Sequence, residues 1–113
     1  MTETRLIVFT KPTEGREAEY NDWYDNRHLT DILAIPGFRG AQRFRHRPTA
    51  TGPSAPEEYM AIYEIEGGVD QAQAAFADAP TVGATGPSDA LFSAVTLWWF
   101  ESIGPYRASP GGE

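Results

Sequence analysis

The 113-residue chain contains no cysteine and only two histidines. The absence of cysteine excludes a disulfide framework, a cysteine nucleophile and every metal site built on thiolates. It also suits the reducing cytoplasm, where we expect the protein to reside. The longest apolar run near the N-terminus, Leu6 to Phe9, is too short for a signal-peptide core or for a membrane span of ~20 residues. We therefore expect no association with a membrane.

Basic residues are scarce as well. Nine Lys and Arg stand against 16 Asp and Glu, which gives a formal net charge of −7 at pH 7. Because this charge repels phosphate backbones, nucleic acid is not an expected partner. The two histidines have no metal-binding spacing such as H-x-x-x-H, so no metal site is expected. The glycines at 83–86 lack the lysine of a phosphate loop, and no G-x-S-x-G signal is present. The chemistry that remains is acid–base chemistry without a bound cofactor.

Aromatic residues, in contrast, are abundant. Six Phe, five Tyr and three Trp are more bulky, amphipathic surface than a minimal core of this size needs. The length fits one domain, which we assign to residues 1–104. Residues 105–113 contain two prolines and two adjacent glycines, and they are expected to form a loose C-terminal tail.

The pattern of apolar residues and breakers predicts the element order β-α-β-β-α-β. We expect strands over 4–10, 39–47, 58–66 and 94–101, helices over 16–34 and 69–79, and loops over 48–56 and 81–88. Two β-α-β halves that share one four-stranded antiparallel sheet, covered on one face by two helices, define the α+β ferredoxin-like architecture. The sequence therefore predicts this fold class.

The pairing of the two middle strands can be predicted from charge and hydrophobicity. If Phe44 lies opposite Ala61, then Gln42 and His46 join Phe44 on an apolar face that packs against the helices. On the other face Arg39 then lies opposite Glu66 and Arg47 opposite Glu58, while Arg43 and Arg45 lie across from Ile62 and Met60. This outer face has no helix to cover it, which favours a symmetric homodimer. The aromatic residues expected in the core are Phe9, Phe44, Tyr59, Phe76 and Phe92.

His28 is the only histidine in a predicted helix. On a regular helical wheel it lies ~80° from Tyr20 and ~40° from Tyr24, so the three side chains share one side. An imidazole that titrates near neutrality beside an apolar cavity can act as a general acid or base on a phenol or an acidic C–H. The alternative is a packing residue whose ring bonds a backbone carbonyl near the helix end.

Other candidate ligand contacts surround this histidine. Tyr20, Trp23 and Tyr24 continue the helical stripe, and they either form flat walls and donors for a planar substrate or simply pack on the sheet. Tyr63, on the face expected to point inward, has the same two interpretations. Arg43 can bind a carboxylate or phosphate in a bidentate manner, or it can pair with the strand glutamates. Of Trp98 and Trp99 only one faces the helices; the sequence leaves the choice open, and Trp99 is kept as the candidate.

The chain also resembles a known family. Its Glu19-Tyr20-Asn21-Asp22-Trp23-Tyr24-Asp25-Asn26-Arg27-His28-Leu29 stretch, with Ile35-Pro36-Gly37-Phe38, Arg43-Phe44 and Glu101-Ser102-Ile103-Gly104-Pro105, is similar to the EthD-like branch of the dimeric α/β-barrel superfamily. The resemblance implies two subunits that pair into a dimeric α/β barrel and a ligand cavity between the sheet and the helices of each. Members include cofactor-independent monooxygenases, cyclases, isomerases, decarboxylating enzymes, haem-degrading proteins and proteins of no known activity.

Together these observations favour a homodimeric enzyme acting on a hydrophobic aromatic or polyketide-like small molecule. The family pattern places general acid–base chemistry on His28, serving cyclisation, isomerisation, decarboxylation or cofactor-independent oxygenation. One alternative is a non-catalytic accessory or stress-related dimer whose interior is filled by side chains. A further alternative is haem binding and degradation, which requires His28 or His46 to ligate iron.

Overall fold

The structure is a computed structural model that describes residues 2–79 and 92–111. Its elements follow the predicted order: β1 (Glu3–Pro12), α1 (Glu17–Trp23), η1 (Tyr24–His28), α2 (Leu29–Leu33), β2 (Phe38–Arg45), β3 (Tyr59–Glu66), α3 (Val69–Asp78) and β4 (Phe92–Glu101). The loop predicted over 81–88, with its glycines, lies outside the described residues. The other expected strands and helices are confirmed, with ends that move by two residues or fewer.

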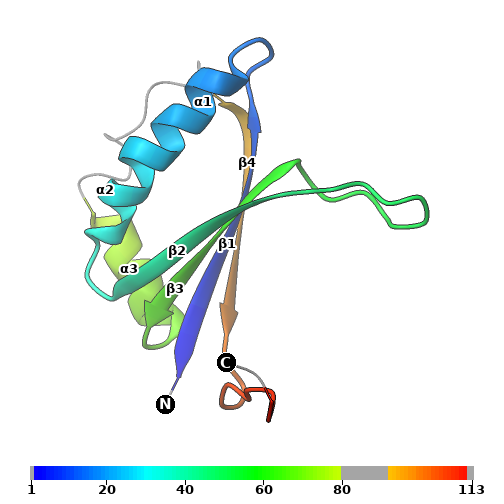
Figure 1. The fold of residues 1–113 in the computed structure, drawn as a ribbon. Helices are drawn as coiled ribbons and strands as arrows, with labels where there is room; N and C mark the ends of the chain where they lie inside the picture. The colour runs from blue at the N-terminus through cyan, green and yellow to red at the C-terminus, as the bar shows by residue number, and fades with distance from the viewer. Residues whose placement is uncertain (1, 80–91, 112–113) are drawn as a thin grey trace.

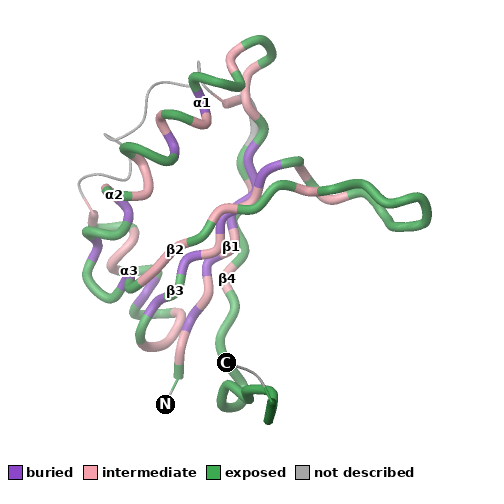
Figure 2. The backbone as a smooth tube through the Cα atoms, in the orientation of Figure 1, coloured by how far each residue is buried: buried purple, intermediate pink, exposed green. Residues whose placement is uncertain are grey.

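The strands form one antiparallel sheet in the order β2-β3-β1-β4. The described helices lie on the same face of it, and the two halves of the chain interleave in the sheet (Figure 1). This is the α+β ferredoxin-like fold that the sequence predicts. The core lies between β1, β3 and the helices, where buried residues concentrate (Figure 2). Its most deeply buried large side chains are Tyr20, Tyr63, Leu6 and Ile65.

The first helical segment runs without interruption from Glu17 to Leu33. It contains neither proline nor glycine, and Glu17 and Glu19 supply the negative charge that stabilises a helix N-terminus. The segment ends ahead of Gly37, whose φ of +90° is a left-handed conformation that favours glycine. Ile35 and Phe38 on either side of this turn are buried, so the turn also anchors the start of β2.

The predicted register between β2 and β3 is wrong by one residue. Arg43, not Phe44, lies opposite Ala61, and Phe44 lies opposite Met60. An irregularity between Phe38 and Gly40 shifts the pairing, because Phe38 enters the core while the strand beyond it continues in the opposite phase. The residues that consequently face the helices are Ala41, Arg43 and Arg45, and those that face away are Gln42 and Phe44.

The charge pairs expected from that register are absent among the described residues. Arg39 pairs with Glu3 on β1 at 3.2 Å instead of with a β3 glutamate. Arg43 pairs with a helix carboxylate, as described below. Phe44 leaves the predicted core and is 41% exposed on the outer face. The sequence pattern alone favoured the apolar face of β2 as the buried one, and the strand irregularity reverses that choice.

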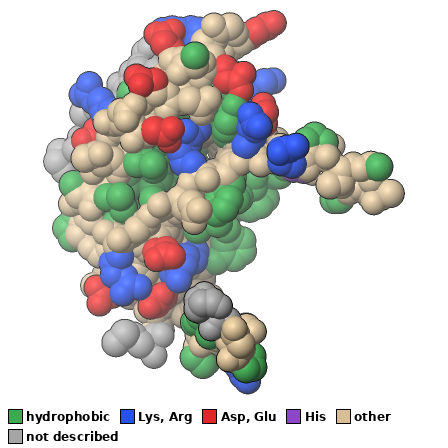
Figure 3. All heavy atoms as spheres, viewed as in Figure 1, with side chains coloured by type: hydrophobic (Ala, Val, Ile, Leu, Met, Phe, Trp, Pro, Cys, Tyr) green, Lys and Arg blue, Asp and Glu red, His purple; other side chains and the backbone are tan. Residues whose placement is uncertain are grey.

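The outer face of the sheet therefore has an apolar part, while Glu3, Arg5 and Glu64 lie at one end of it. Phe44, Trp98 and Phe100 are the large hydrophobic side chains exposed on it. Phe9 packs edge to face on Trp98 at 5.4 Å between ring centroids. Figure 3 shows hydrophobic side chains gathered beneath the projecting arm that connects β2 and β3. No described helix covers this face (Figure 1).

Within residues 2–79 and 92–111, no helix is long and apolar enough to cross a bilayer.

Candidate functional site

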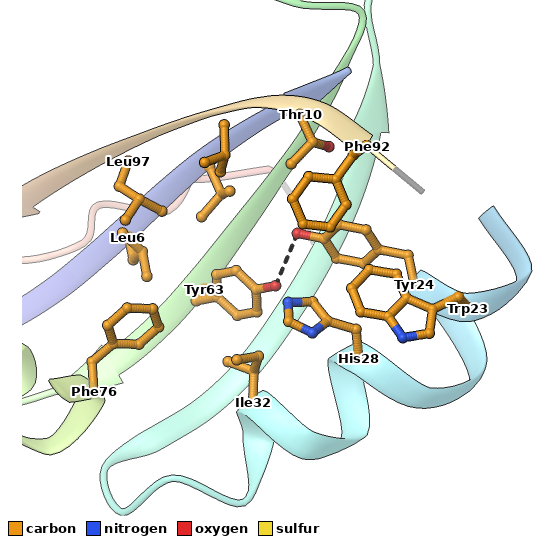
Figure 4. Close-up of a pocket in the computed structure, with 12 residues that line it drawn as sticks. Leu6, Thr10, Trp23, Tyr24, His28, Ile32, Tyr63, Phe76, Phe92 and Leu97 are labelled. Atoms are coloured by element: carbon orange, nitrogen blue, oxygen red, sulfur yellow. Dashed lines mark hydrogen bonds between the residues drawn. The ribbon is translucent and has the colours of Figure 1, made fainter. Parts of the chain in front are cut away.

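A cavity of about 230 Å³ lies between the sheet and the helices (Figure 4). Val95 and Leu97 of the edge strand β4 line it while 52% and 42% exposed, so this side is open. Among the described residues that line the cavity, none carries a carboxylate, ammonium or guanidinium group. They are Leu6, Val8, Thr10, Trp23, Tyr24, His28, Ile32, Tyr63, Phe76, Phe92, Val95 and Leu97.

The helix segment that lines the cavity is a π-helical turn, Tyr24–His28. The N–H of Leu29 donates to the carbonyl of Tyr24, five residues earlier, instead of four. The wider turn lets the His28 ring stack on the Trp23 indole, with centroids 4.5 Å apart and planes 22° apart. In a regular α-helix residues five apart point ~140° away from each other. The π-helical turn therefore creates this contact, and the helical wheel could not predict it.

His28 sits in a mostly aromatic environment. Besides the Trp23 indole, the Tyr24 ring contacts the imidazole nearly at right angles, with ring centroids 4.9 Å apart. Burial lowers the pKa of His28 to about 4, and the nearby Asp31 carboxylate offsets only part of that effect. The imidazole is therefore neutral at physiological pH, so it can accept a proton or a hydrogen bond but does not present a cation to the cavity.

Two tyrosine hydroxyls form the second polar feature of the cavity. The hydroxyls of Tyr24 and Tyr63 are 3.2 Å apart and hydrogen-bonded to each other. Burial raises the pKa of Tyr24 to about 12, and burial together with Tyr24 also raises the pKa of Tyr63. Both are therefore neutral phenols, and the bond between them uses one of their two protons. Figure 4 shows both hydroxyls and the His28 imidazole turned toward the same part of the cavity.

The walls around these groups are flat and aromatic. Phe92 stacks on Trp23 with centroids 5.8 Å apart and planes 28° apart. Phe76 lies farther along the cavity, and its ring packs edge on with that of Trp99, with ring centroids 5.6 Å apart. Thr10 also lines the cavity, but its hydroxyl is hydrogen-bonded to that of Tyr20. His28, Tyr24 and Tyr63 are thus the polar side chains best placed to meet a ligand.

The remaining predicted site residues surround this group without lining the cavity. Tyr20 is fully buried behind it. Trp99 lies on the helix-facing side of β4 and packs on the core through Phe76, whereas Trp98 lies on the outer face. Arg43, expected on the outer face, instead points toward the helix. Its guanidinium donates to Asp25 Oδ1 and Asn21 Oδ1, each at 2.8 Å.

Several residues that line the cavity were not predicted from the sequence. Strand alternation could have identified Leu6, Val8 and Thr10, because they share the face of β1 that also faces the core. Phe76 and Phe92 were expected only as core residues. Within the described ranges, no group of three or more His, Asp or Glu side chains could hold a metal ion.

Comparison with known proteins gave one curated relative and a set of structures. No family model matches the chain. Core atranone cluster protein 1 from Stachybotrys chlorohalonatus is 35% identical over 63 residues, which are 54% of this chain and 25% of that protein. The chain therefore corresponds to about a quarter of that relative's length.

Solved structures match over nearly the whole chain. An EthD family protein from Bacillus halodurans has a TM-score of 0.64 and 20% identity, covering 89% of this chain and 99% of that one. The chain therefore has the ferredoxin-like fold that these structures share. This confirms the fold class predicted from the sequence.

Other structures with this ferredoxin-like fold differ in function. SnoaB, a cofactor-independent oxygenase from Streptomyces nogalater, has a TM-score of 0.60 and 16% identity over 99% of this chain and all of that one. A MhuD variant with two manganese protoporphyrins per active site has a TM-score of 0.63 and 21% identity over 93% of this chain and 99% of that one. Further neighbours, among them one from Thermobifida fusca, are described as dimeric ferredoxin-like proteins of unknown function.

Proposed function

We propose that the protein is a homodimeric enzyme that binds an uncharged, planar aromatic or polyketide-like molecule in the cavity and transfers a proton through His28. The observation that carries this proposal is the composition of the cavity: its described lining has flat aromatic walls, no charged side chain, and one imidazole beside a pair of tyrosine hydroxyls. The oxygenase SnoaB and the atranone cluster protein are consistent with a ligand of this class.

The geometry supports enolisation as the elementary step. A neutral His28 nitrogen takes a proton from an acidic C–H or phenol O–H, and the electron pair of the broken bond moves onto the substrate oxygen. The Tyr24 and Tyr63 pair donates a hydrogen bond to that oxygen as its negative charge develops. Because burial makes His28 a weak base, this donation assists the transfer by stabilising the anion. Cyclisation, isomerisation and oxygen addition can all begin from the resulting anion, whereas decarboxylation forms such an anion by loss of CO₂ and ends when the anion takes up a proton.

Dimerisation through the outer face belongs to the same proposal. Phe44, Trp98 and Phe100 are exposed there beside partly buried neighbours such as Ile62. Burying such surface against a second copy is favourable. The neighbours described as dimeric agree with this arrangement. The cytoplasmic location stays a prediction from the absence of cysteine.

Ligand binding can be tested with two probes that share the same rings. Quenching of tryptophan fluorescence should show 2-naphthol binding, with 2-naphthoate binding at least ~10-fold more weakly because the described lining holds no cation. Tighter binding of 2-naphthoate would contradict the assignment of an uncharged ligand. Turnover is tested by the exchange of 2-tetralone α-protons in D₂O, since a non-catalytic accessory protein would bind 2-naphthol and leave this exchange at its uncatalysed rate.

Haem degradation, the function suggested by MhuD, fits the cavity poorly. The Trp23 indole covers one face of the His28 ring and restricts the rotation that would bring a ring nitrogen onto an iron porphyrin. The described cavity, at about 230 Å³, is also small for a four-pyrrole macrocycle. His46 lies on the arm beyond β2, outside the cavity lining. Titration with haemin should therefore leave its Soret band unshifted, and a shifted band that disappears in His28→Ala would favour haem instead.

A further inference from the structure

Arg43 is a cation held between the sheet and the helix. Its side chain is 13% exposed, and Asp25 supplies the negative charge that balances it at 2.8 Å. The guanidinium carbon lies 4.4 Å from the centroid of the Tyr24 ring, 5.3 Å from that of Tyr20 and 5.6 Å from that of Tyr59. Burying a cation is costly unless its hydrogen bonds and charge are met, and here the helix residues meet both.

The two helix partners of Arg43 flank Tyr24 in the sequence. Asn21 and Asp25 are one helical turn apart, and each accepts one N–H of the guanidinium. The planar fork of arginine is suited to holding two acceptors at once, which lysine cannot do in the same plane. With its plane fixed in this way, the guanidinium covers one face of the Tyr24 ring. The hydroxyl of the same Tyr24 side chain is hydrogen-bonded to the hydroxyl of Tyr63.

We infer that Arg43 is a positioning residue: it holds the Tyr24 ring so that its hydroxyl stays on Tyr63 and the pair faces the cavity. This inference deepens the proposed function and rests on it for its catalytic meaning. It replaces anion binding as the role of Arg43, because the guanidinium is already engaged by Asn21 and Asp25 and does not line the cavity. The effect on a ligand is therefore transmitted through Tyr24.

A test that needs no substrate uses the tyrosines themselves. The chain has five tyrosines, so ¹³Cζ-labelled tyrosine gives few NMR signals, each assignable with a Tyr→Phe variant. Tyr63 is the reporter, since the rings that Arg43 covers are those of Tyr20, Tyr24 and Tyr59. Tyr24→Phe defines the Tyr63 shift that follows loss of the hydroxyl bond. Arg43→Gln should reproduce at least half of that shift, and Arg43→Lys, which keeps the charge without the fork, should lie between.

The controls separate positioning from general stability. Arg39→Gln removes an exposed arginine from the same strand and should leave the Tyr63 signal unchanged. If Arg43→Gln does not fold, Asp25→Asn keeps the side-chain shape, removes the balancing charge and should move the Tyr63 signal in the same direction. An unmoved Tyr63 signal in a folded Arg43→Gln protein, with the Tyr20 and Tyr59 signals displaced, would overturn the inference.

Ligand binding then connects Arg43 with the cavity. Arg43→Gln should weaken 2-naphthol binding by ~10-fold, about the value of one good hydrogen bond, and change naphthalene binding by less than ~2-fold, because naphthalene has no oxygen to bond. Equal losses for both probes would mean a collapsed cavity and would contradict positioning. If the wild-type protein binds neither probe, the proposed function fails, while the Tyr63 signal still decides the role of Arg43.

Discussion

The imidazole of His28 lies stacked on the indole of Trp23, five residues earlier, with ring centroids 4.5 Å apart. This contact exists because the helix widens to a π-helical turn between Tyr24 and His28. It places the histidine against the cavity wall and removes water from one face of its ring. Burial keeps His28 neutral, and the Trp23 indole is one of the groups packed on its ring.

The low pKa of His28 makes stability depend on pH in a definite direction. In the unfolded chain the group titrates near its ordinary value of 6.5, and in the folded protein it titrates near 4. Between these values the unfolded state binds the extra proton, so the free energy of unfolding falls as pH drops from 6.5 to 4 by up to ~3 kcal/mol. Denaturant titrations should show a smaller fall in His28→Gln over the same range. Parallel curves for both proteins would contradict the depressed pKa.

Trp23 is expected to control that pKa. Trp23→Leu removes the stacked indole and admits water to the His28 ring, so the pKa of His28 should rise toward its ordinary value. The pKa is measured from the ¹³C shift of the imidazole during an NMR titration. Trp98→Leu, on the outer face, serves as the matched control and should leave the titration of His28 where it is.

The tyrosine pair should matter only for ligands that carry an oxygen. Tyr63→Phe deletes one hydroxyl of the pair and should weaken 2-naphthol binding by ~10-fold, with little effect on naphthalene. Tyr106→Phe, in the exposed C-terminal tail, is the matched control. Retention of full 2-naphthol affinity in Tyr63→Phe would show that the ligand oxygen binds elsewhere.

The outer face should hold two subunits together. Sedimentation of the wild-type protein at micromolar concentration should give twice the 12.4 kDa mass of the chain. Trp98→Glu places a charge in the apolar surface and should give the monomer mass. Leu33→Glu changes an exposed leucine on the helix side and should leave the dimer intact. A wild-type monomer would refute the interface.

Much of the fold follows from local patterns in the chain. The alternation of β3 from Tyr59 to Glu66 is regular, and its inward and outward residues were predicted correctly. The register of β2 was not, because an irregularity near Gly40 reverses its faces and because burial of Arg43 depends on Asn21 and Asp25, which lie on another element. No pairwise strand pattern contains that information.

The candidate site divides in the same way. His28, Trp23 and Tyr24 could be singled out by residue type and helical spacing, and Tyr63 by its place on the inward face of a strand. The structure brings them together around one cavity. The Trp23 and His28 stack could not be predicted, since it depends on a π-helical turn that breaks the regular wheel. Tyr20 from α1 and Trp99 from the helix-facing side of β4 pack in the core instead of lining the cavity.

The central claim, that His28 transfers a proton, is tested most directly by the exchange of 2-tetralone α-protons in D₂O, followed by ¹H NMR at pH 7. The wild-type protein should accelerate the exchange, and His28→Ala should lose ~100-fold or more of that acceleration, the usual contribution of a general base. His46→Ala changes the other histidine, which lies on the arm. This variant should catalyse the exchange at the wild-type rate. Equal rates for His28→Ala and the wild-type protein would contradict the account.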